Sequence, residues 1–249
     1  SLIKHYILNI LKSIQKIIFL KVFWRKFLNK YEIVSKIEKF APLETQEKWD
    51  CSGWIVDKVD NIEVKKILFA LTITEDVVKQ AQEKECDMII SHHPMFSVPL
   101  EYKNINIYCA HTNLDRAEGG TTDTLIKELG FKKTATDDFV RIVELKESIS
   151  VDELKEKLLK ISPKLRYVNN LNTKKIKTIG FCAGSGSEFI GETDAFVTGD
   201  LKFHTALDSK KVVFDIGHFE SEIFAPQILK TITQVGDKGI IADEKSPFI

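Results

Sequence analysis

The 249-residue sequence lacks the features that mark several classes of protein. It has only four cysteines, which are far apart and form no C-x-x-C pair, so they indicate reduced, buried thiols in a cytoplasmic protein. No apolar run approaches the ~18 residues that a membrane-spanning helix needs. The 36 basic and 36 acidic residues leave no net charge. A balanced total gives no signal for nucleic acid as a partner.

The first 31 residues are the one strongly basic part of the chain. They contain seven basic residues and no acid, which leaves the remainder mildly acidic with 29 basic and 36 acidic residues. Isoleucines from Ile3 to Ile17 recur at three- and four-residue spacing and predict an amphipathic helix. Apolar residues surround this predicted helix from Phe19 to Leu28. That pattern favours a helical extension over residues 1–31 that packs on the body or on a neighbouring subunit, over one that contacts a membrane.

After Pro42 the sequence alternates between β-rich apolar runs and helix-like segments. The predicted strands are 64–72, 87–91, 105–110, 177–183, 195–198 and 211–216. The predicted helices are 75–85, 120–129, 151–160, 201–209 and 220–230. This alternation predicts an α/β fold in which helices cover both faces of parallel or mixed sheets.

Histidine is scarce, yet five of the six histidines follow or lie close to predicted strands: His92, His93, His111, His204 and His218. In open α/β sheets, ligands bind beyond the carboxyl ends of the strands. Histidines that follow neighbouring strands are therefore expected to share one crevice.

A tandem pair of histidines ends the predicted strand 87–91. Successive side chains of an extended chain point in opposite directions, so His92 and His93 are expected to hold different members of a pair of ions. Pro94 keeps His93 extended because it disfavours the helical conformation of the preceding residue. An isolated histidine is more often a core residue, but the tandem pair after a buried strand favours metal ligation.

Two further segments offer imidazole and carboxylate groups. His218 and Glu222 are separated by four residues, which places both side chains on one helical face. Asp115 lies in a turn-rich segment, where an Asx-type turn is the alternative to metal binding. Nitrogen and oxygen ligands without cysteine suit Zn, Fe, Mn, Co or Ni better than an iron–sulfur cluster.

Two glycine-rich segments could bind phosphate through main-chain N–H groups. They are Gly184-Ser185-Gly186-Ser187 and Gly119-Gly120. Neither matches a P-loop or a dinucleotide-binding motif, so ordinary turns are the favoured interpretation.

Several of these segments together resemble a known family. From Ile33 to the C-terminus the chain resembles the dinuclear-metal-centre proteins called GTP cyclohydrolase I type 2 homologues, or the NIF-three-like family. The matching blocks are Ala41-Pro42-Leu43 with Trp49-Asp50, Ser91-His92-His93-Pro94, His111-Thr112-Asn113-Leu114-Asp115, Thr198-Gly199-Asp200 with His204, and Gly217-His218 with Glu222. The N-terminal segment departs from the usual beginning of the family, so the resemblance assigns it no role.

The resemblance implies a site and an architecture. It places two divalent ions on His92, His93, Asp115, His218 and Glu222, with Glu222 as the bridge between them. It also implies two α/β lobes that face each other across the metal site. The first lobe would comprise 32–135 with 217–249, and the second 136–216. The subunits would resemble those of ring-shaped hexamers.

The implied activity is hydrolysis of a nucleotide or a related small molecule. Two ions a few Å apart lower the pKa of a bridging water and polarise the bond under attack. His111 and His204 would then act as general acid or base, or orient the ligands. The alternative is a metal-binding assembly or regulatory protein without catalysis.

Overall fold

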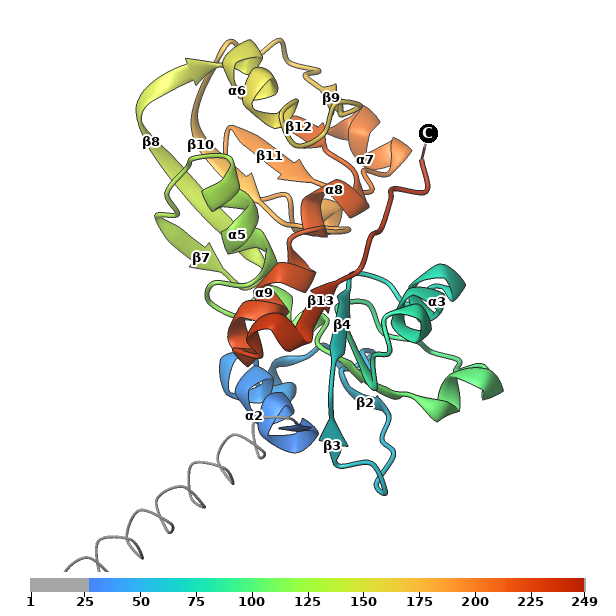
Figure 1. The fold of residues 1–249 in the computed structure, drawn as a ribbon. Helices are drawn as coiled ribbons and strands as arrows, with labels where there is room; N and C mark the ends of the chain where they lie inside the picture. The colour runs from blue at the N-terminus through green and yellow to red at the C-terminus, as the bar shows by residue number, and fades with distance from the viewer. Residues whose placement is uncertain (1–26, 249) are drawn as a thin grey trace, which may run out of the picture.

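The computed structural model describes residues 27–248, and its strands form two large sheets in separate lobes (Figure 1). Both sheets are mixed and flanked by helices, so the predicted fold class is confirmed. The predicted helix over the first residues lies outside the described part. Within the described residues, no helix is both long and apolar enough to cross a membrane.

The first sheet has five strands and carries the tandem histidines at the end of its central strand. Its order is β13 (Gly239–Ile241), β4 (Ile67–Ala70), β5 (Met88–Ser91), β6 (Asn106–Cys109) and β2 (Gly53–Val56). All neighbours are parallel except β2, which is antiparallel to β6. Every residue of β4, β5 and β6 is buried, as expected for central strands covered on both faces.

Three helices cover this sheet. On one face α2 (Lys30–Phe40) and α9 (Ala225–Thr233) share a core through Ile37 and Leu229. On the other face α3 (Glu75–Glu83) packs through Val77 and Ala81. Thr74 caps α3, because its hydroxyl accepts a hydrogen bond from the Val77 N–H.

The second sheet has six strands. Its order is β7 (Ala135–Asp137), β8 (Val140–Ser150), β10 (Lys175–Phe181), β11 (Ala195–Thr198), β12 (Val212–Asp215) and β9 (Arg166–Val168). The three strands β10, β11 and β12 are parallel, and the others are antiparallel to their neighbours. Its helices are α5 (Thr121–Glu128), α6 (Val151–Leu158) and α7 (Phe203–Asp208).

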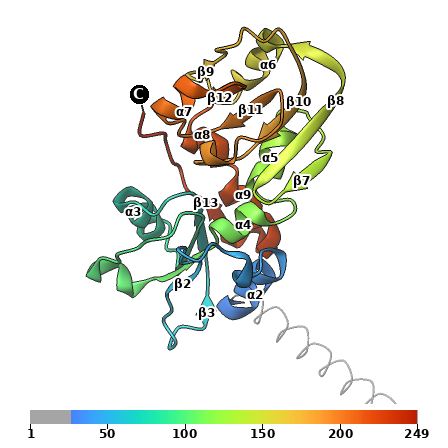
Figure 2. The ribbon, with the colours of Figure 1, turned by 180° about the vertical axis from the view of Figure 1, so that it is seen from behind.

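Two short helices lie where the lobes meet: α4 (Thr112–Arg116) follows β6, and α8 (His218–Glu222) follows β12. A two-stranded ribbon pairs β1 (Leu28–Asn29) with β3 (Glu63–Val64). Both views show α9 beside the five-stranded sheet, next to α2 and at the end that meets the other lobe (Figures 1 and 2). The chain thus passes from the six-stranded sheet through α8 and α9 back to the five-stranded sheet.

Three of the differences from the predicted elements involve longer segments. The helix predicted over 220–230 is two helices, because Pro226 near the start of α9 cannot donate a main-chain hydrogen bond to a preceding turn. The helix α2 begins at Lys30, so the predicted end of the basic extension at residue 31 falls inside a helix. The eleven-residue strand β8 was not predicted. The predicted lobe boundaries at 135 and 216 stay predictions.

Candidate metal centre

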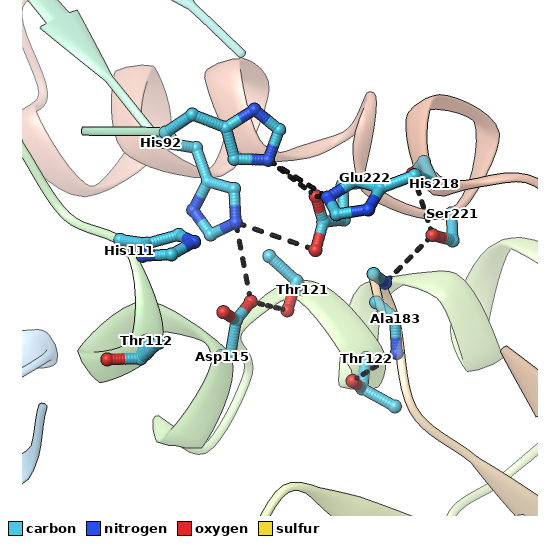
Figure 3. A network of polar contacts seen from close by, with 12 residues as sticks. His92, His111, Thr112, Asp115, Thr121, Thr122, Ala183, His218, Ser221 and Glu222 are labelled. Carbon is cyan, nitrogen blue, oxygen red and sulfur yellow. Dashed lines mark hydrogen bonds and ion pairs between the residues drawn. The ribbon is translucent and has the colours of Figure 1, made fainter. Parts of the chain in front are cut away.

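Three segments bring their side chains together where the two lobes meet (Figure 3). His92 and His93 follow β5, and their main-chain N–H groups donate to the carbonyls of Ala70 and Leu71 on the β4 side. These bonds extend the strand pairing past the end of β5, so both histidines keep the alternating directions of a strand. The other segments provide His111 and Asp115 near α4, and His218 with Glu222 on α8.

Glu222 lies at the centre of this cluster. Its Oε2 is 2.9 Å from His93 Nε2 and 3.0 Å from His218 Nε2. Its Oε1 is 3.8 Å from His92 Nε2, and Asp115 Oδ1 is 3.5 Å from the same nitrogen. The two oxygens of one carboxylate therefore face two different groups, one with His92 and Asp115 and one with His93 and His218. In each group the potential ligand atoms lie within 4.8 Å of one another.

Each of the four histidines is held through its Nδ1 atom. The acceptors or partners are Ala110 O for His92 at 2.8 Å, Thr72 Oγ1 for His93 at 2.7 Å, Asp50 Oδ1 for His111 at 2.9 Å, and Asp200 Oδ2 for His218 at 2.6 Å. Because Nδ1 is engaged, Nε2 is the nitrogen left for the interior of the cluster. Such outer contacts orient histidines that bind metal ions.

His92 provides the test of whether these residues fit a metal ion. Its side chain is fully buried, and Nε2 has no hydrogen-bond partner. The nearest oxygens, of Asp115 and Glu222, are too distant for hydrogen bonds. A buried polar atom without a partner costs free energy, so its position calls for a ligand. Three imidazoles and two carboxylates form a donor set that suits divalent transition metals.

The electrostatics of the cluster favour positive charge. Burial lowers the pKa of His92, but the charges of Asp115 and Glu222 outweigh it and raise this pKa to about 9. The hydrogen bond with Glu222 raises the pKa of His218 to about 10, against the effect of burial. Burial would raise the pKa of Glu222, but its histidine contacts hold it well below the usual value. Protonated His92 and His218 thus supply positive charge in the cluster, and bound metal cations would take the place of these protons.

Asp50 and Asp200, for which the sequence predicts no role, orient histidines. The side chain of Asp50 is fully buried and also accepts hydrogen bonds from the main-chain N–H groups of Thr112, at 3.1 Å, and Cys51, at 2.7 Å. The hydrogen bond and charge of His111, together with hydrogen bonds from the Thr112 hydroxyl and the Cys51 N–H, hold the pKa of Asp50 well below its usual value despite burial. Asp200 orients His218 in the same way from a more exposed position. Both residues lie in the sequence blocks that match the family, and this was the only feature of the sequence that pointed to them.

Arg141 connects the two lobes beneath Asp115. It lies on β8, is fully buried, and its Nη2 donates to the carbonyls of Asp115, Arg116 and Ala117 at 3.0–3.2 Å. Its Nε donates to Asp123 Oδ2 at 2.9 Å. The guanidinium therefore satisfies carbonyls at the end of α4, which would otherwise lack helical partners, and fixes the helix that carries Asp115.

The glycine-rich segment at 184–187 is a turn that makes room for Glu222. A Cβ on Gly184 would lie 2.1 Å from Glu222 Oε1, and Gly184 has φ +67°. Its N–H donates to Ser221 Oγ and that of Gly186 to Thr198 Oγ1, each at 2.9 Å. These contacts favour the turn interpretation over a phosphate cradle.

His204 does not join the cluster. It lies exposed on α7 beside Phe203, with ring centroids 5.3 Å apart, and lines a separate surface pocket with Glu188 and Lys210. The sequence expectation that it shares the crevice is therefore wrong. Its place in α7, beyond the turn that follows β11, separates it from the strand ends that carry the other histidines.

A cavity of about 590 Å³ adjoins the cluster between the lobes. His111, Asp115, His218 and Glu222 contribute to its lining. The remaining lining residues come from both lobes: Glu47, Trp49, Thr112, Thr122, Asp138, Phe139, Cys182, Ala183, Ser185, Glu188 and Phe189. The cluster is thus accessible to a small molecule.

Solved structures of similar fold come from several bacteria. The crystal structure of TTHA1606 from Thermus thermophilus has a TM-score of 0.77 at 21% identity, covering 89% of this chain and 100% of that one. A Bacillus cereus protein related to NIF3 also has a TM-score of 0.77, at 19% identity, covering 90% and 99%. These likenesses show the fold.

Sequence relatives show the family. A Clostridium perfringens protein named GTP cyclohydrolase 1 type 2 homolog is 35% identical over 83% of this chain and 91% of the relative. A Campylobacter jejuni protein of the same name is 34% identical over 87% and 97%. The sequence pattern that defines Duf34/NIF3 (NGG1p interacting factor 3) matches residues 28–240. The chain therefore belongs to the Duf34/NIF3 family.

Proposed function

We propose that this protein binds two divalent metal ions and uses them to hydrolyse a small molecule. His92 and Asp115 would hold one ion, His93 and His218 the other, and Glu222 would contribute one oxygen to each. The observation that carries the proposal is the position of this single buried carboxylate between two groups of ligand atoms. The unpartnered Nε2 of His92 supports it from inside the cluster.

A pair of divalent ions lowers the pKa of a bound water and polarises the bond under attack. The chain contributes proton transfer through His111, which lines the cavity. Asp50 accepts a hydrogen bond from the Nδ1–H of His111, which leaves the Nε2 lone pair free to take a proton from a reacting group and return it. Thr121 donates a hydrogen bond to Asp115 Oδ1 and so directs that carboxylate.

The names of the relatives support hydrolysis as the reaction class. The Clostridium perfringens and Campylobacter jejuni proteins are both named as homologues of a cyclohydrolase, and a cyclohydrolase opens a ring by hydrolysis. A name transferred between relatives is weaker support than the geometry, because one fold carries different activities.

The test uses metal-free protein reloaded separately with Zn, Mn, Fe, Co or Ni. Formate release is measured on a purine panel that contains base, nucleoside, monophosphate and triphosphate. We expect metal-dependent turnover in the native chain, loss of it in Glu222→Gln, and retention in Glu220→Gln on the same helix. Turnover that survives Glu222→Gln, or no metal-dependent turnover across the panel, would contradict the hydrolase proposal.

A further inference from the structure

The cavity beside the cluster has aromatic walls from both lobes. Trp49 is 61% exposed, and its ring lies edge-on to His111 with centroids 5.9 Å apart. Phe189 is 37% exposed and packs against Phe139, with ring centroids 5.6 Å apart. Large aromatic side chains that remain exposed in a cavity offer faces and edges on which a flat ring can stack.

The charged part of the lining is acidic. Apart from the cluster, the cavity is lined by the carboxylates of Glu47, Asp138 and Glu188, and no lysine or arginine is among its lining residues. Arg116 lies nearby, but it pairs with Glu47 and Asp138 at 2.6 Å each. Glu188 forms no hydrogen bond or ion pair with any residue in the range 27–248. Of the three carboxylates, only that of Glu188 therefore has no ion-pair partner among residues 27–248.

The N–H groups of the glycines in the two glycine-rich segments are also engaged. The N–H groups of Gly184 and Gly186 donate to hydroxyls of the protein. At the other glycine-rich segment, Gly119 N–H donates to Asp123 Oδ2 at 3.0 Å and Gly120 N–H to Ala117 O at 3.0 Å. A phosphate chain would gain none of these hydrogen bonds unless it displaced an internal one.

Building on the proposed function, we propose that the substrate is a planar heteroaromatic compound, neutral or cationic, that carries no polyphosphate. Its ring stacks between Trp49 and Phe189, with the group to be hydrolysed directed at the cluster. A nucleobase or nucleoside satisfies these conditions. A nucleoside triphosphate would place several negative charges beside Glu188, in a cavity whose lining residues include no lysine or arginine.

Calorimetric binding of guanosine, GMP and GTP to the whole chain tests this proposal, because the three ligands share one ring and differ in phosphate. Metal is first removed by chelation, so phosphate–metal bonds do not contribute. We expect guanosine to bind most tightly and GTP at least about tenfold more weakly. Trp49→Ala should weaken guanosine binding about tenfold or more, since stacking of a base on an aromatic side chain has about that worth. Phe203→Ala, which removes an exposed ring outside the cavity, should leave guanosine binding unchanged.

A second pair of variants tests the charge of the wall. Glu188→Lys should strengthen GTP binding several-fold and change guanosine binding little, because it replaces a repulsive charge by an attractive one. Glu147→Lys makes the same charge change at an exposed position of β8 and should alter neither.

Three results would overturn the substrate class: GTP binding as tightly as guanosine, guanosine not binding, or Trp49→Ala and Phe203→Ala behaving alike. Metal content and turnover are measured separately on the same preparation. The guanosine, GMP and GTP binding measurements need no metal. A cluster that binds no ions would therefore contradict the proposed function without changing the outcome of these measurements.

Discussion

The two halves of the cluster are anchored in different ways. His92 is fully buried, its Nδ1 is held by a main-chain carbonyl, and its partner Asp115 lies on a helix whose end is held by the buried Arg141. In the other half the side chains of His93 and His218 are 20% and 33% exposed. His218 is oriented there by Asp200, whose side chain is 47% exposed.

This difference indicates how firmly each half would hold an ion. Ligands fixed by main-chain bonds and buried contacts need little reorganisation, whereas an exposed carboxylate gives a partner that moves and is screened by solvent. We therefore expect the His92–Asp115 half to bind its ion more tightly and to release it more slowly.

The largest effect is expected from a substitution of Glu222, because its carboxylate would serve both halves of the cluster. Glu222→Gln should lower metal content from about two ions per chain to nearly none, as each group loses the charged oxygen it shares. Elemental analysis of the purified variant measures this. Glu220→Gln on the same helix is the matched control. A Glu222→Gln protein that keeps both ions would show that the carboxylate is not shared.

Removing one ligand from each half sharpens the comparison. Asp115→Asn and His218→Ala should each lower metal content to about one ion per chain. The ion that remains in His218→Ala should leave more slowly under chelation, because it sits in the buried half. Stopped-flow chelation with a chromogenic chelator follows both rates. Equal rates, or the reverse order, would contradict the difference in anchoring.

Arg141 is expected to stabilise the folded protein around the His92–Asp115 half of the cluster. Arg141→Met removes a positively charged partner of the Asp123 carboxylate and the donor to the carbonyls of α4. This should lower the free energy of unfolding by about 3–5 kcal/mol. Denaturant titration measures this loss. Lys79→Met, which removes an exposed pair with Glu83 on α3, should cost less than about 1 kcal/mol. Similar losses in the two variants would argue against the role of Arg141.

Asp200 should influence only the exposed half. Asp200→Asn keeps the size of the side chain but weakens the bond that orients His218, so affinity for one of the two ions should fall about 10- to 100-fold. Competitive titration against a chelator of known affinity resolves the two sites. A loss spread equally over both ions would mean that the halves are not independent.

The smallest expected effect is a pH dependence of stability caused by Asp123 at the lobe junction. Burial raises the pKa of Asp123, but hydrogen bonds from Lys133 and Arg141 outweigh it and lower the pKa below its ordinary value. A lowered folded-state pKa contributes stability above the unfolded pKa of about 4, and this contribution disappears as pH falls through the folded-state value. The stability advantage of the native chain over Asp123→Asn should therefore shrink below about pH 4. An advantage that stays constant from acidic to neutral pH would contradict this assignment.

The sequence was sufficient where a local pattern determines direction. His92 and His93 lie at the end of a buried strand and face different partners, as strand alternation requires. His218 and Glu222 share one face of α8, as their four-residue spacing predicts. Metal binding by these residues stays a prediction.

The sequence was insufficient where a partner is distant along the chain. Asp50 is 61 residues from His111, and no local pattern shows that the two will pair. Arg141 is likewise defined by contacts across the lobe junction that only the folded chain reveals. His204 was misplaced for a different reason. It lies on the helix predicted over 201–209, but the sequence did not show that this helix leaves His204 exposed and away from the cluster.

Anomalous X-ray diffraction from crystals of the metal-loaded protein tests the central claim most directly. The account predicts two peaks per chain on either side of Glu222, one within coordination distance of His92 and Asp115 and the other of His93 and His218. A single peak, peaks away from Glu222, or no anomalous density in the cluster would contradict it.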